Sequence, residues 1–148
     1  MKRMMAFVCA VIYLFTLSGC SPVASNPGTD DEWGIVLVAK DVTSTGMTIL
    51  CAQGGVELDG NLLSSSYYRL EWPKDGAWVR VRSNGTRNWT DAGWTVRKNG
   101  MVEWKENWES MYGSLAPGQY RVAKKFSYTS ATGVNEEKEY YLEFTIGD

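Results

Sequence analysis

The sequence predicts an all-β fold, a sandwich of about seven or eight short antiparallel strands. Apolar and polar residues alternate over short runs, which is the period of a strand with one buried face. Clusters of Gly, Pro, Asn and Asp separate these runs at fairly regular intervals. No segment keeps a helical period for long, and no internal repeat is evident. Regularly punctuated short runs of this kind are typical of all-β domains.

The expected strands are placed by this alternation and by β-branched and aromatic residues. In the second of them Met47, Ile49 and Cys51 share one face, which we expect to be buried. In chain order the expected strands cover Gly34–Lys40, Gly46–Gln53, Ser66–Trp72, Ala77–Arg82, Gly93–Lys98, Met101–Lys105, Gln119–Thr129 and Glu139–Ile146.

Two turn signals predict hairpins between neighbouring strands. Pro73-Lys74-Asp75-Gly76 separates the third and fourth strands, with Pro setting φ for the turn and Gly supplying a positive φ. Asn99-Gly100 separates the fifth and sixth strands and is the strongest two-residue hairpin signal in the chain. The last two strands carry apolar rows that should face the core, and these rows are Tyr120, Val122 and Phe126, and Tyr140, Leu142, Phe144 and Ile146.

The strand number and spacing are those of an immunoglobulin-like, Greek-key sandwich. Such sandwiches often contain a tyrosine corner, in which a Tyr hydroxyl bonds to backbone a few residues upstream. We expect Tyr120 to be that residue, Leu115 to plug the core, and Pro117 and Gly118 to form the turn.

The stretches YYRLE (67–71), GAWV (76–79), WESMYGSLAPGQYRV (108–122) and YLEFTI (141–146) together resemble a bacterial Ig-like domain family. The Y-G-x-L-x-P-G-x-Y-R element carries most of the resemblance, which covers most of residues 33–146. The family occurs in secreted and lipid-anchored proteins, so the resemblance implies a sandwich fold and a surface location. It implies no catalytic residues and no defined ligand.

The N-terminus has the pattern of a signal peptide that is cleaved off. Lys2 and Arg3 precede an apolar run of 12 residues, Ala6–Leu17, which is short for a membrane-spanning helix. The run closes on Leu17-Ser18-Gly19-Cys20, which resembles the lipobox of bacterial lipoproteins. Cleavage between Gly19 and Cys20, with a lipid on the Cys20 sulfur, would place the protein on the outer face of a bacterial membrane.

Three regions follow from this interpretation: a signal peptide (1–19), the lipidated Cys20 with a flexible tether (20–32), and one domain (33–148). The tether is rich in Ser, Pro, Gly and Asp, and 12 such residues would span roughly 20 Å. Removing the leader changes the net charge from -2 to -4, which argues against nucleic-acid binding.

The composition excludes several kinds of chemistry. The chain has no His, so catalysis by Ser-His-Asp or Cys-His groups and metal binding through His are excluded. After processing, Cys51 is the remaining internal thiol, and its strand-like surroundings predict a buried, inert group. Three carboxylates, Glu103, Glu106 and Glu109, are expected on solvated faces rather than in a catalytic pair. We therefore expect no catalytic residues, no metal and no cofactor.

Tryptophans are the main candidates for ligand contacts. We expect Trp72, Trp78, Trp104 and Trp108 to be mostly in the core, and Trp94 is ambiguous. Trp89 lies in a polar loop with Arg87 and Asn88, so these three are the candidate ligand contacts. The competing interpretation is a Trp89 ring folded back over the sandwich.

The basic pair Lys124-Lys125 is expected to protect an edge strand from pairing with another chain. The sequence as a whole predicts a lipid-anchored surface protein with a non-catalytic module for protein interaction or structural support. The alternative is a carbohydrate- or peptidoglycan-binding module that uses Trp89. The expected partner is a protein or a glycan.

Overall fold

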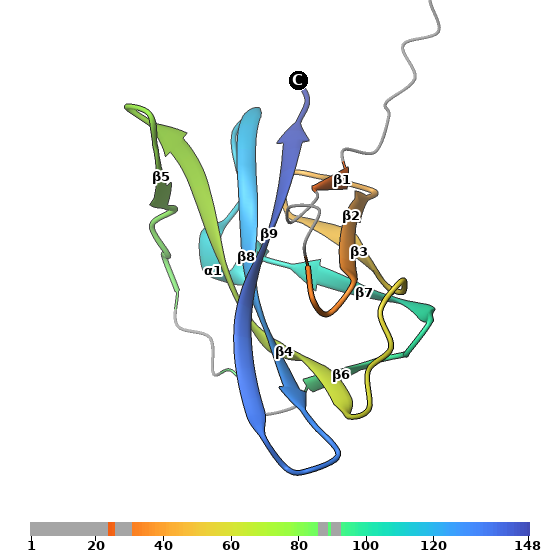
Figure 1. The fold of residues 1–148 in the computed structure, drawn as a ribbon. Coiled ribbons are helices and arrows are strands. Elements are labelled where there is room, and N and C mark those ends of the chain that lie inside the picture. The colour runs from red at the N-terminus through yellow and green to blue at the C-terminus, as the bar shows by residue number, and fades with distance from the viewer. Residues whose placement is uncertain (1–23, 26–30, 86–88, 90–92) are drawn as a thin grey trace, which may run out of the picture.

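The computed structural model describes residues 24–25, 31–85, 89 and 93–148, and these form a sandwich of two antiparallel sheets (Figure 1). The four-stranded sheet has the order β1-β2-β3-β7. The five-stranded sheet has the order β5-β4-β8-β9, and β6 also pairs with β4. The all-β prediction is therefore confirmed. The elements are β1 (Ala24–Ser25), β2 (Ile35–Lys40), β3 (Gly46–Gln53), β4 (Asn61–Lys74), β5 (Ala77–Arg80), β6 (Gly93–Val96), β7 (Gly100–Asn107), α1 (Glu109–Tyr112), β8 (Gly118–Thr129) and β9 (Asn135–Ile146).

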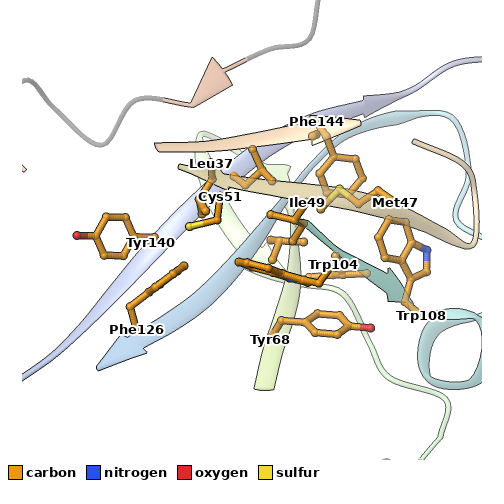
Figure 2. Packing of buried hydrophobic residues seen from close by; sticks show 14 of the residues in the cluster. Leu37, Met47, Ile49, Cys51, Tyr68, Trp104, Trp108, Phe126, Tyr140 and Phe144 are labelled. Atoms are coloured by element: carbon orange, nitrogen blue, oxygen red, sulfur yellow. The ribbon is translucent and has the colours of Figure 1, made fainter. Parts of the chain in front are cut away.

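The core lies between the inner faces of the two sheets. Ile49 and Cys51 from the four-stranded sheet point toward Phe126 and Phe144 from the five-stranded sheet (Figure 2). These side chains are all buried, as the alternation of the sequence predicts. The rings of Trp108 and Phe144 add an aromatic contact, with centroids 5.5 Å apart.

Strand β4 begins five residues earlier than the predicted Ser66 and runs past its predicted end at Trp72. Its pairing with β8 shifts in register between Ser64 and Tyr68, which indicates an irregularity in the ladder. The first half of β4 was not predicted, because serines interrupt the alternation of apolar and polar residues there. Leu62 and Ser64 are nevertheless buried, and both pair with β6 on one side and β8 on the other.

The prediction of a hairpin at Asn99-Gly100 is wrong. Strand β6 pairs with β4 in the five-stranded sheet, whereas β7 pairs with β3 in the four-stranded sheet. The turn therefore carries the chain from one sheet to the other. Asn99 has a φ of 48°, as such a turn requires, and its N–H donates to Gln53 Oε1 at 2.7 Å. A turn signal specifies a local reversal but not the hydrogen-bonding partners of the two flanking strands.

The predicted hairpin between β4 and β5 forms, but its turn differs from the expected one. Lys74 pairs with Ala77, so the loop holds only Asp75 and Gly76, with φ values of 52° and 80°. Two consecutive positive φ values define a type I′ turn. Pro73 lies in the strand opposite Trp78 and does not start the turn.

Part of the predicted tether is attached to the sandwich. Ala24 and Ser25 pair with β2, and the Asp31 carboxylate accepts bonds from Ile35 N at 2.6 Å and from the Tyr140 hydroxyl at 2.5 Å. The predicted signal peptide, with Gly19 and Cys20, lies outside the described residues. Within the described ranges no helix has the length and apolar character to cross a membrane.

Candidate functional site

The stretch that leads into β8 makes a corner. The Tyr120 hydroxyl donates to the Ala116 carbonyl oxygen at 2.9 Å, four residues upstream. Leu115 is buried, and its N–H donates to Ser44 O at 2.9 Å, which ties the corner to the loop between β2 and β3. Gly118 has a φ of 151°, which favours glycine. These contacts fix the start of β8 and one wall of a neighbouring cleft.

Trp89 is half-buried rather than fully exposed. Its ring makes edge contacts with Tyr67 and Tyr68, at centroid distances of 5.0 and 5.1 Å. The side chain thus folds back onto β4, which leaves less of the ring for a ligand. Arg87 and Asn88, the other predicted contacts, lie outside the described residues.

The expectation that Trp72 belongs to the core is wrong. Trp72 is 44% exposed, because the pairing of β4 with β8 ends at Glu71 and Arg121. Beyond that point β4 and β5 diverge from β8 (Figure 1). Trp72 keeps the parity of an inward-facing residue, but no opposing sheet covers it.

The other tryptophans divide between core and surface. Trp104 and Trp108 are buried, as predicted. Trp78 is half-buried, and the Arg121 guanidinium carbon lies 4.7 Å from its ring centroid. Trp94 is 45% exposed on the side of the molecule that carries β6, and it stacks on Trp104 with centroids 6.4 Å apart.

A cleft of about 660 Å³ lies between the β4–β5 hairpin and the corner at the start of β8. This volume is in the usual range for ligand pockets. One wall is the exposed indole of Trp72 and its neighbour across the hairpin, Val79. The lining residues are Trp72, Lys74, Val79, Arg80, Val81, Arg82, Asn84, Leu115 and Tyr120.

The charged residues that line the cleft are all basic. Lys74, Arg80 and Arg82 are exposed there, and no carboxylate is among the lining residues. Across the described part of the chain, none of these three cations forms an ion pair. The nearby carboxylate of Glu71 is instead engaged by Arg69 at 2.7 Å and by Arg121 at 2.6 Å. The cleft is therefore a positive region on a chain whose net charge is -2.

The sequence did not point to this cleft. The sequence pattern predicts Trp72 in the core and predicts no role for the basic residues on either side of the turn at Asp75-Gly76. The available signal was the spacing of Lys74, Arg80 and Arg82 around the apolar residues of one hairpin. Where β8 stops pairing with β4 is a tertiary property, and it decides whether that hairpin is covered.

The expectation for Lys124 is also wrong. Strand β8 is not an edge, because it lies between β4 and β9, and Lys124 is fully buried on its inner face. Its Nζ bonds to Glu106 Oε1 of β7 at 2.7 Å, across the two sheets. The rings of Tyr68 and Trp104 lie 5.8 and 5.3 Å from the same Nζ. The buried ion pair thus links the sheets.

Glu106 is correspondingly not on a solvated face, whereas Glu103 and Glu109 are exposed as expected. Glu103 pairs with Lys40 on the surface. Glu106 has no access to a substrate, because it is buried against Lys124. Glu103 and Glu106 are thus each engaged in an ion pair, one on the surface and one between the sheets.

Cys51 is completely buried, and burial raises the pKa of its thiol to about 12. A thiol in this state is a poor nucleophile at neutral pH. No group of three or more Asp, Glu or Cys residues in the described ranges is placed to hold a metal ion. Among the described residues, this cleft combines shape and positive charge in a way that suits contact with another molecule.

The sequence model of one protein family, described as a bacterial Ig-like domain, matches residues 31–145 of the chain. The matched range takes in β2 through β8 and nearly all of β9. No curated protein and no solved structure matches the chain.

Proposed function

The chain belongs to the bacterial Ig-like domain family. From that premise we propose that it is a lipid-anchored surface protein whose module binds a partner protein or gives structural support at the cell envelope. The observation that carries the anchoring is Leu17-Ser18-Gly19-Cys20, directly after the apolar run Ala6–Leu17. Family membership itself suggests a non-catalytic module. Its proposed site of action is the outer face of the bacterial cell membrane.

The position of β1 limits the distance between the domain and the membrane surface. Only residues 21–23 separate Cys20 from the paired residue Ala24. Three extended residues reach at most about 10 Å. A lipidated Cys20 would thus hold the sandwich close to the headgroups rather than on the longer tether that the sequence predicts.

The anchoring is tested with Cys20→Ala, using metabolic labelling with a fatty acid and separation of membranes from medium. The variant should lose the label and either leave the membrane or remain unprocessed. Cys9→Ala is the matched control, because Cys9 lies in the apolar run and should not carry lipid. Label retained on Cys20→Ala would show that the lipobox interpretation is wrong.

Carbohydrate binding through Trp89 is the weaker candidate. The ring of Trp89 is half-buried and makes edge contacts with two tyrosines, so less of it is open for stacking on a sugar than in a fully exposed indole. Trp89→Ala should leave binding of the protein to cell-wall glycans unchanged, as measured by cosedimentation. Loss of such binding would restore this candidate.

A further inference from the structure

We propose that the cleft between the β4–β5 hairpin and the start of β8 binds an extended, acidic peptide segment of a partner protein. One apolar side chain of that segment would enter the cleft against Trp72. The proposal rests on the proposed interaction role and names the class of partner and the surface that meets it.

The apolar part of the cleft supplies a place for one side chain. Trp72 is 44% exposed, and behind it the lining is aliphatic at Val79, Val81 and Leu115. Covering an exposed indole that lies beside aliphatic side chains buries a large apolar area, which favours binding. Tryptophan and arginine are also enriched among the residues that dominate binding energies. Asn84 is the one neutral amide side chain on the lining, so most of the polar groups that a partner would meet there are cationic.

The charge of the cleft selects an anionic partner. Lys74, Arg80 and Arg82 line it without a compensating carboxylate, although the chain as a whole is negative. Their ammonium and guanidinium groups are solvated and unpaired within the described ranges, so a partner carboxylate need not displace an existing ion pair. Complementary charge of this kind raises association rates and excludes basic partners.

The backbone of β5 favours a peptide over other anions. Among the described residues, β5 is the terminal strand of its sheet. Lys74 and Ala77 close the two-residue turn, so they form a hydrogen-bonded pair, and the next pair, Pro73 and Trp78, is not hydrogen-bonded. The N–H and C=O groups of Trp78 therefore point away from β4, toward the open edge. An extended peptide can pair with such an edge while its alternate side chains reach the cleft.

The experiment uses the full-length chain purified in detergent and a random-peptide display library. Recovered peptides should be enriched in Asp and Glu around one large apolar residue. A synthetic consensus peptide should bind the Trp72→Ala variant about tenfold more weakly or worse, as measured by fluorescence anisotropy. Arg82→Glu should weaken binding similarly and is independent of the indole. The matched control is Trp94→Ala, because Trp94 is 45% exposed on another strand and should leave affinity unchanged.

The proposal is overturned if the recovered peptides lack acidic residues, or if both cleft variants bind like the wild type. Binding that survives in the cleft variants would keep the interaction role and refute the site. Polygalacturonate provides a further arm. If it binds the wild type but not Trp72→Ala, the cleft belongs to an anionic glycan instead. The lipid-labelling result on Cys20 is independent of all these outcomes, so a failed cleft is distinguishable from a failed anchor.

Discussion

Replacing Lys124 with Met removes the cation from the ion pair that joins the two sheets. The Met side chain keeps most of the apolar stem, so the change leaves the Glu106 carboxylate buried at 5% exposure without its partner 2.7 Å away. Removing one member of a buried pair typically costs about 3–5 kcal/mol. A domain of this size is stable by about 5–15 kcal/mol, so the variant should lose a large share of its free energy of unfolding.

The free energy is measured by guanidinium unfolding followed by tryptophan fluorescence, with thermal unfolding as a second readout. We expect Lys124→Met to lower the midpoint temperature by roughly 10–20 °C. Lys125→Met is the matched control, because Lys125 is the next residue of β8 but is exposed and pairs with Glu137 at 3.3 Å. Exposed ion pairs contribute about 0–1 kcal/mol to stability, so the midpoint temperature of the control variant should change little.

The double variant Lys124→Met with Glu106→Leu separates the two causes of destabilisation. Because it removes the unpaired charge as well, its stability should return to within about 1 kcal/mol of the wild type or exceed it. The two single changes should then be strongly non-additive. If Lys124→Met costs no more than Lys125→Met, or if the double variant is as unstable as the sum of the singles, the argument from a desolvated charge is refuted.

The β4–β5 turn gives a smaller prediction: Gly76→Ala should cost about 1 kcal/mol, because its φ is 80°, although an added Cβ would meet nothing within 4 Å. Gly54→Ala, also in open space but without a positive φ, should be neutral or slightly stabilising in the same unfolding assay, and equal losses would contradict the conformational explanation. Cys51 should resist alkylation at pH 8 in the native protein, because a pKa of about 12 leaves the thiol protonated there, and should react in denaturant. Mass spectrometry of the Cys51 peptide checks this, and rapid native modification would show that the thiol is accessible.

Local chemistry in the sequence was sufficient for most of the strand pattern, but not for β1 or the first half of β4. The period of two placed Met47, Ile49 and Cys51 on one buried face, and the same rule identified the inner rows of β8 and β9. Asp75-Gly76 specified a tight reversal because few residues other than glycine adopt a positive φ easily. These properties depend on a residue and its near neighbours, so a single chain carries them.

What the tertiary structure decided was which faces are covered and which strands pair. Trp72 and Lys124 both lie on inward positions of their strands. Trp72 is nevertheless exposed, because the pairing of β4 with β8 ends at the preceding residue, Glu71. Lys124 is buried, because β7 of the other sheet places Glu106 opposite it. The chain between β6 and β7 likewise changes sheet at a turn that reads as a hairpin. Alternation shows only that a strand has two faces. Whether a face meets protein or water depends on the opposing sheet, and the cleft lies where no opposing sheet covers Trp72.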